Sequence, residues 1–218
     1  RTTGGGNGSK SGFSTASLSR KFIMPHLIDY AAIEDKIFVL IHLCGGSPLV
    51  CLNYKIGRSS KVYDAYDWLE YQGRLKVIVS NNLIEIAIKV RMLEDFIRLE
   101  LDEDDILDPA GIDLKKKDEE ARSGLEIGRF VEGQGTLTLR ESFNKIVHAT
   151  DAKLIWAEPE DTEEEVEWWC GEYSLFGRMR GKVWHVELYV ADWCLAVRKY
   201  IPESVRPAPG STSNPLTC

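Results

Sequence analysis

The longest helical pattern in the chain lies within residues 64–101, and it constrains the fold more than any other segment. Apolar residues recur there at intervals of three and four, at Leu83, Ile86, Ala87, Val90, Leu93 and Ile97. That spacing places them in one stripe along a helix, which predicts a long helix packed against a core. The charged residues of the segment fall largely off the stripe: Arg91, Glu94, Asp95 and Arg98. Ser80 or Asn81 can cap the start of this helix.

An apolar segment at residues 22–43 predicts one or two further buried helices. We expect Gly45, Gly46 and Pro48 to end them, because glycine frees the backbone and proline cannot continue a helix. Residues 49–56 alternate weakly and fit either a strand or a loop. The apolar run near residues 37–44 is shorter than a bilayer span, and no signal-peptide pattern is present, so we predict no membrane contact.

The C-terminal third has a different pattern, typical of a β-hairpin followed by a helix. Residues 172–179 and 182–190 form the two strands, with Arg180 and Gly181 in the turn. Residues 192–200 fit a closing helix, and residues 153–167, which precede the hairpin, contain an acidic loop with Pro159. The predicted fold class is therefore α+β and mostly α: a helical bundle with a C-terminal β-hairpin and a closing helix.

One domain is predicted for residues 20–202, between a flexible tail at 1–19 and a disordered tail at 203–218. The chain has 218 residues and 44% hydrophobic residues, which is enough for one sizeable core. Its five cysteines are scattered, with no CxxC pair, which favours reduced thiols in a cytoplasmic protein. We predict no cofactor and no metal site, since Cys44 and Cys51 near His42 lack an evident fourth ligand.

The net charge of −7 argues against a broad surface for nucleic acid. A local basic cleft is still compatible with it, provided that the segment at 138–148 and the hairpin meet. Such a cleft would contain Arg140, Lys145, Arg178, Arg180 and Lys182. Five aromatic residues, Trp168, Trp169, Tyr173, Trp184 and Trp193, could stack on bases, but packing between the hairpin and the bundle is the favoured interpretation.

The segment at 138–148 predicts one helix with two faces, and it carries the candidate site. Leu139, Phe143 and Ile146 form an apolar stripe, whereas Arg140, Asn144 and His148 form a polar stripe on a neighbouring face. Thr138 and Glu141 match a capping box at the helix start, and the helix is expected to run about a turn beyond His148. A titratable imidazole beside an amide and a guanidinium is a combination suited to acid–base chemistry.

This helix resembles the signature helix of HEPN domains, in which arginine, a polar residue that is often Asn, three further residues and His follow one another late in a small helical bundle. Asn144 and His148 fill two of these positions at the family's spacing. Phe143 stands where the family has its arginine, and Arg140 lies one turn upstream.

The resemblance implies a metal-independent endoribonuclease that works as a homodimer in bacterial defence or toxin–antitoxin systems. His148 would be the general acid or base, Asn144 would orient His148 or the phosphate, and Arg140 would stabilise charge in the transition state. The predicted partners are RNA, a second copy of the chain, and an antitoxin or other protein. The alternative is a non-catalytic module that uses the same helix as a homodimer interface, with Asn144 and His148 as a buried polar pair.

Overall fold

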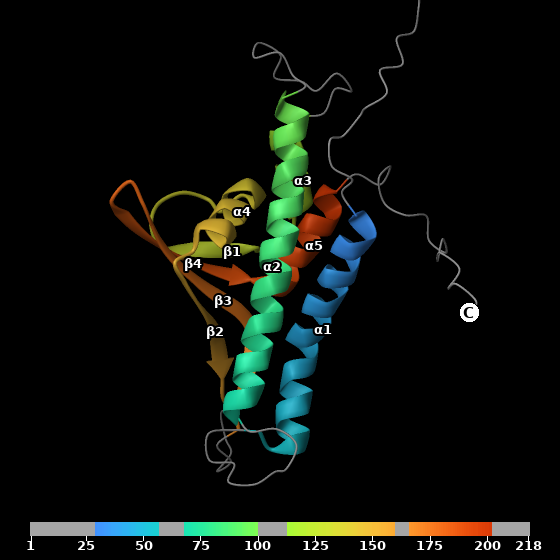
Figure 1. The fold of residues 1–218 in the computed structure, drawn as a ribbon, viewed down its shortest axis with the longest axis vertical. Coiled ribbons are helices and arrows are strands. Elements are labelled where there is room, and N and C mark those ends of the chain that lie inside the picture. The colour runs from blue at the N-terminus through green and yellow to red at the C-terminus, as the bar shows by residue number, and fades with distance from the viewer. Residues whose placement is uncertain (1–28, 57–67, 100–112, 160–165, 202–218) are drawn as a thin grey trace, which may run out of the picture.

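The computed structural model describes residues 29–56, 68–99, 113–159 and 166–201 (Figure 1). The tails predicted at 1–19 and 203–218 lie outside these ranges. The described elements are, in chain order, α1 (Tyr30–Tyr54), α2 (Trp68–Leu99), α3 (Leu114–Arg122), β1 (Gly128–Glu132), α4 (Leu139–His148), β2 (Asp151–Ala157), β3 (Trp168–Met179), β4 (Lys182–Tyr189) and α5 (Val190–Tyr200). The predicted fold class, α+β and mostly α, is confirmed.

The four strands form one antiparallel sheet in the order β1-β4-β3-β2. The predicted hairpin is confirmed: residues 172–179 of β3 pair with residues 182–189 of β4, and Arg180 and Gly181 both have positive φ, 50° and 82°. Positive φ at both central residues is typical of the type I′ turn that matches strand twist. The first residues of the segment predicted to contain an acidic loop belong to β2 (Asp151–Ala157), which pairs with β3, and residues 160–165 of that segment lie outside the described residues.

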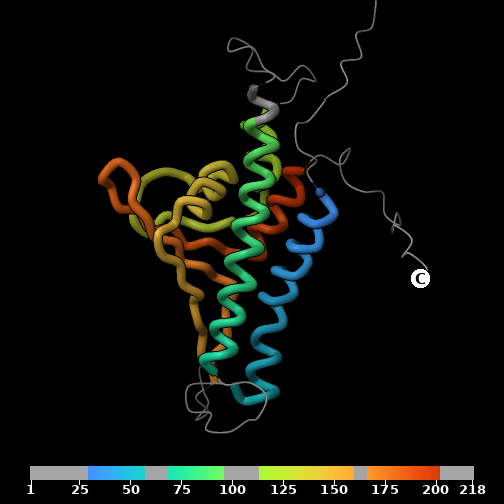
Figure 2. The backbone as a smooth tube through the Cα atoms, viewed as in Figure 1, coloured from blue at the N-terminus to red at the C-terminus, as the bar shows by residue number. Residues whose placement is uncertain are grey.

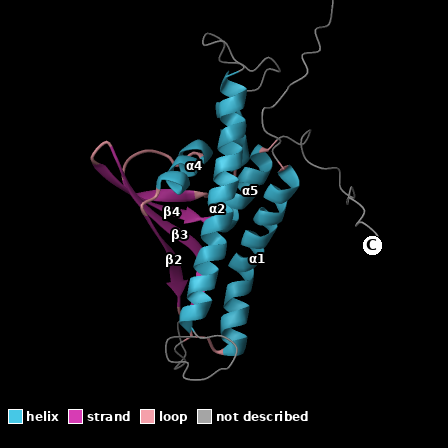
Figure 3. Cartoon of the chain, in the orientation of Figure 1, coloured by secondary structure: helices cyan, strands magenta, loops and turns pink. Residues whose placement is uncertain are grey.

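One face of the sheet is covered by helices, and the core lies between them. Figure 3 shows the helices gathered on one side of the strands, and α1, α4 and α5 all contact β3. Four of the five aromatic residues predicted to pack, Trp169, Tyr173, Trp184 and Trp193, are buried in this layer, whereas Trp168 is half-buried. The alternation predicted for β4 is also confirmed, with Trp184 buried and His185 half-buried on the opposite face.

Helix α2 begins at Trp68, twelve residues before the predicted start at Ser80. Ser80 lies in mid-helix, where its hydroxyl donates to the Lys76 carbonyl at 2.6 Å and also lies 2.5 Å from the Tyr173 hydroxyl. The earlier turns are stabilised by an aromatic cluster, because Trp68 packs edge-on against Trp156 at 4.7 Å. This contact between distant segments of the chain is not visible as a local capping pattern.

Helix α1 continues to Tyr54, so the prediction that Gly45, Gly46 and Pro48 end it is wrong. The Ser47 hydroxyl holds this part of the helix in place: it accepts a hydrogen bond from the Trp169 backbone N–H at 3.0 Å and lies 2.9 Å from the Tyr71 hydroxyl. Tertiary contacts therefore outweigh the local cost of a proline inside a helix. The helix ends at Lys55, which has φ 50°.

The continuous α1 also changes the basis of the membrane prediction. It is long and apolar enough to cross a membrane by length and composition, and 22% of its most apolar window is buried. Core helices and signal sequences pass the same test, so the expectation of no membrane contact stays a prediction. Figure 2 shows α1 and α2 side by side along most of their length.

Helix α4 forms where the capping pattern predicts it. The Thr138 hydroxyl accepts a hydrogen bond from the Glu141 backbone N–H at 3.1 Å, and Leu139, Phe143 and Ile146 are buried. The helix does not extend past His148, since Ala149 is extended and β2 begins at Asp151. The closing helix predicted for residues 192–200 is present as α5.

Candidate functional site

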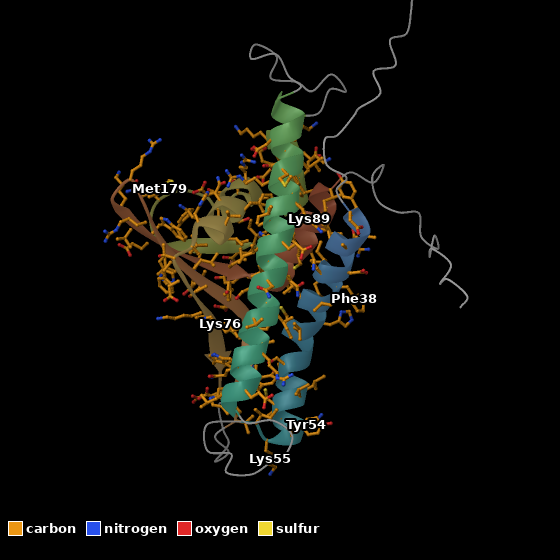
Figure 4. All side chains as sticks on the ribbon, viewed as in Figure 1. Phe38, Tyr54, Lys55, Lys76, Lys89 and Met179 are labelled. Carbon is orange, nitrogen blue, oxygen red and sulfur yellow. The ribbon has the colours of Figure 1, made fainter. Side chains whose placement is uncertain are left out.

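A pocket of about 570 Å³ lies between α4 and the far end of the β3–β4 hairpin. It is lined by Glu141, Asn144, Lys145, His148, Arg178, Met179, Arg180 and Trp184. Figure 4 labels Met179 at the hairpin end of the molecule, where several side chains project beyond the ribbon. The helix and the hairpin therefore meet, as the predicted basic cleft requires. Lys145, Arg178 and Arg180 line the pocket, whereas Arg140 and Lys182 are not among its lining residues.

Trp184, which lines the pocket, packs against a glycine in β3. The Trp184 ring lies directly against Gly177, so that a Cβ added at this glycine would overlap the ring. Lys145 lies over the same indole, with Nζ 4.5 Å from the ring centroid of Trp184 and 5.7 Å from that of Phe130. A cation over aromatic faces is stabilised electrostatically, by about 2 kcal/mol when it is desolvated.

Lys145 is nearly buried, with a side chain only 7% exposed. Its charge is balanced by Glu141 one turn earlier on α4, at 3.1 Å. These contacts hold the Lys145 side chain in one position. If it moved, its charge would remain buried but would lose the carboxylate and the two aromatic rings that stabilise it. Glu141 is the only carboxylate among the lining residues, so the ion pair leaves the positive charge of Arg178 and Arg180 unbalanced within the pocket.

Arg178 and Arg180 project from the end of the hairpin and are both exposed. Within the described part of the chain, neither guanidinium has a carboxylate within ion-pair distance. Asn144 is half-buried on the opposite wall, where its amide can both donate and accept. Two free guanidinium groups facing an amide and an imidazole make a site suited to phosphate oxygens.

His148 is exposed at the end of α4, and Arg91 of α2 contacts its ring. The Arg91 Nη1 atom lies 3.3 Å from Nε2 of His148. Since a guanidinium can only donate hydrogen bonds, Nε2 is the acceptor, and the neutral ring carries its proton on Nδ1. Arg91 is in turn 3.8 Å from Asp95, so the imidazole is tied to an ion pair on α2.

Arg140 points away from the pocket and toward α2. Its guanidinium donates to the Glu94 carboxylate at 2.7 Å and to Asp95 at 2.6 Å. Burial disfavours its charge, but the hydrogen bonds to the two carboxylates outweigh burial and raise the pKa of Arg140 above its ordinary value. Glu94 also accepts a hydrogen bond from the Tyr200 hydroxyl at 2.5 Å, so that this ion pair joins α2, α4 and α5.

The structure thus brings two of the three predicted site residues, Asn144 and His148, to the pocket and commits the third, Arg140, to an ion pair on α2. Arg91 was missed as a neighbour of His148, because no local spacing connects residues on two different helices. Glu94 was placed off the apolar stripe of α2, yet it is 2% exposed. Its position four residues after Val90 was the signal that it faces the core.

No other part of the described chain offers a comparable set of reactive groups. Within the described residues, no three His, Cys, Asp or Glu side chains come close enough to hold a metal ion. The four described cysteines are free thiols, and burial raises the pKa of Cys44 to about 12. Burial also raises the pKa values of Cys51, Cys170 and Cys194, which disfavours the nucleophilic thiolate.

Comparison of the chain with protein-family models, with curated proteins and with solved structures gives no significant match.

Proposed function

We propose that this protein binds single-stranded RNA by its phosphates in the pocket between α4 and the hairpin, and cleaves it without a metal ion. The observation that carries the proposal is the gathering of Lys145, Arg178, Arg180, Asn144 and His148 around one pocket of about 570 Å³. Their chemistry fits the resemblance of the α4 sequence to the signature helix of HEPN domains.

Binding would rest on the two hairpin arginines. Arg178 and Arg180 can each hold a phosphate with two parallel hydrogen bonds, and the described residues supply no competing carboxylate within ion-pair distance. Lys145 lies 4.5 Å from the Trp184 ring centroid and is paired with Glu141, so the net positive charge of the pocket comes from Arg178 and Arg180. In a chain of net charge −7, this local cluster provides the attraction that the surface as a whole does not.

Cleavage would rest on His148. With Nε2 engaged by Arg91, the Nδ1–H group is the donor that the ring presents. In the proposed reaction the ribose 2′-oxygen attacks the adjacent phosphorus and its proton passes to solvent. The bond from phosphorus to the 5′-oxygen breaks. His148, which has first taken up a solvent proton at Nε2 and so released Arg91, donates its Nδ1 proton to that leaving oxygen and returns to the neutral ring. The products are a 2′,3′-cyclic phosphate and a 5′-hydroxyl. Arg178 or Arg180 would stabilise the charge that develops on the phosphate.

The test compares binding and cleavage of a labelled single-stranded RNA in EDTA. We expect the R178A/R180A variant to bind more weakly, with a salt slope smaller by about one for each arginine that contacts a phosphate. R74A/R129A is the matched control, because it removes two arginines that are 67% and 61% exposed outside the pocket. Equal binding by wild type and R178A/R180A, or equal losses in the two double variants, would contradict the proposed binding site.

The H148A variant separates the reaction from binding. We expect it to keep the RNA affinity of the wild type and to cleave about 10²- to 10⁴-fold more slowly. Wild-type cleavage that survives this substitution would exclude His148 as the proton donor.

The second candidate function is a non-catalytic interaction module, and one observation favours it. Arg140 is already committed to Glu94 and Asp95, and Nε2 of His148 is already engaged by Arg91. Both groups thus have a structural partner without any substrate. RNA binding without cleavage in EDTA would select a binding module, and the absence of both would select a protein-interaction role, including the predicted antitoxin partner.

A further inference from the structure

The outer face of α2 carries apolar residues in the spacing of a coiled coil. Val77, Asn81, Ile84 and Ile88 follow one another at intervals of four, three and four residues. These intervals place them in one seam, as a and d positions do in two-stranded coiled coils. The seam lies opposite the buried stripe of the same helix, and Val77, Ile84 and Ile88 are 58%, 41% and 41% exposed.

Further exposed apolar side chains widen this seam. Ile78 and Met92 lie beside it on α2, each 42% exposed. Helix α1 separately exposes Phe38 and Leu49, by 62% and 64%, and Figure 4 shows Phe38 projecting outward from α1. Exposed apolar patches of this kind mark interaction surfaces, whereas isolated apolar side chains do not.

Asn81 identifies the kind of partner that fits. Its amide is the only polar side chain of the seam between Val77 and Ile88, and it is exposed. In a lipid phase or against a purely apolar surface, this amide would lose its hydrogen bonds to water without replacement. Against a second Asn81 it finds both a donor and an acceptor, because an amide carries each. Such a pair forms when two copies of the helix lie parallel and in register.

Most charges around the seam are paired within one copy. Glu70 pairs with Arg74 at one end of the seam, at 2.6 Å, and this pair is neutral. Beside the seam, Glu85 pairs with both Lys89 and Lys36, at 2.7 and 2.8 Å, so this group keeps one net positive charge. A parallel dimer places this charge near its counterpart, and burial of the apolar seam has to outweigh that repulsion.

We propose that a second copy of this chain docks on the outer face of α2, with the two α2 helices parallel and Asn81 beside Asn81. No described residue of α2 is among those that line the pocket between α4 and the hairpin, and Arg91 is the α2 residue that contacts a lining side chain, His148. This homodimer differs from the predicted homodimer through α4, and its test does not depend on whether the protein binds RNA.

Sedimentation velocity over a range of protein concentrations tests the proposal. We expect the wild-type chain to dimerise and the I84E/I88E variant to raise the dimer dissociation constant by about 30-fold or more, the effect of a hot-spot side chain. V131E/V183E is the matched control, because these valines are 52% and 47% exposed on the sheet. A wild-type monomer, or a dimer that survives I84E/I88E, would overturn the proposal. Far-UV circular dichroism verifies that each variant is folded.

A cysteine at residue 81 tests the register. In a background with serine at Cys170 and Cys218, we expect the N81C chain to form an intermolecular disulfide under mild oxidation, and K153C to remain uncrosslinked. Dimers without the disulfide at residue 81 would contradict the parallel arrangement. Flotation of a monomeric wild-type chain with phosphatidylcholine vesicles would instead assign the apolar face to a membrane and overturn the proposal.

Discussion

Replacement of Arg140 by methionine should destabilise the protein strongly although it lies outside the pocket. The substitution removes two hydrogen-bonded ion pairs, to Glu94 and to Asp95, and leaves the Glu94 carboxylate with only Tyr200 as a described partner. Breaking a fully buried pair costs about 3–5 kcal/mol. The Glu94 side chain is 3% exposed, but the side chains of Arg140 and Asp95 are 29% and 45% exposed. Solvent screening of the exposed partners lowers the expected loss in the free energy of unfolding to about 2–3 kcal/mol.

The assay is urea denaturation at neutral pH, followed by circular dichroism. R140M should lower the urea midpoint with an unchanged slope, and the additional substitution E94Q should recover part of the loss. The coupling free energy between residues 94 and 140 should be about 1–3 kcal/mol. The control R74M removes an exposed pair with Glu70 and should cost less than about 0.5 kcal/mol.

The reasoning would be refuted if R140M cost no more than R74M, or if the losses from R140M and E94Q simply added. A stable R140M variant that no longer binds RNA would show that Arg140 acts in the pocket, as the sequence pattern predicts.

Two further predictions concern packing and pH. Gly177→Ala should lower the melting temperature and cost about 1–3 kcal/mol in the free energy of unfolding, because the new methyl group overlaps the Trp184 ring. Gly73→Ala, on the open side of α2, should instead raise the free energy of unfolding by about 0.5–1 kcal/mol. Equal effects of the two substitutions would contradict the packing of Trp184 against Gly177. Burial raises the pKa of Cys44 from 9.0 to about 12, so its contribution to stability is complete below pH 9 and falls as pH rises toward 12. Between pH 9 and 12, the melting temperature of Cys44→Ala should fall less steeply than that of the wild type. Parallel curves of melting temperature against pH would exclude a contribution of Cys44 to this pH dependence.

The sequence predicts the elements whose signals are local. Helix α4 has its cap at Thr138 and its apolar stripe within eleven residues, and the hairpin has strict alternation around Arg180 and Gly181. Both are stabilised largely by neighbours along the chain, so their patterns can be read without the rest of the fold.

Other elements depend on contacts that no short pattern reveals. Pro48 lies inside α1 because Ser47 is tied to Trp169 and Tyr71, which are distant in sequence. Strands β1 and β2 lie at the two edges of the sheet, where polar side chains weaken the alternation.

The candidate site was predictable in part. Asn144 and His148 follow from the polar stripe of α4, and Arg178 and Arg180 follow from charge in the hairpin. That these two pairs face one another depends on how the hairpin twists over α4, and the contact of Arg91 with His148 depends on how α2 crosses the same helix.

The two walls of the pocket, the end of the hairpin and helix α4, are supported to different extents by the rest of the fold. Strand β2 pairs with β3 only as far as Phe176, and β1 pairs with β4 only as far as His185, so residues 177–184 pair only with each other. Helix α4, by contrast, is anchored in the core by Leu139 and Phe143. Arg178 and Arg180 therefore lie on a hairpin end that no other strand supports, opposite a helix that is fixed in the core. A polyanion that contacts both must restrict the motion of the hairpin end, and the conformational entropy lost in this way lowers the affinity that the charges alone would give.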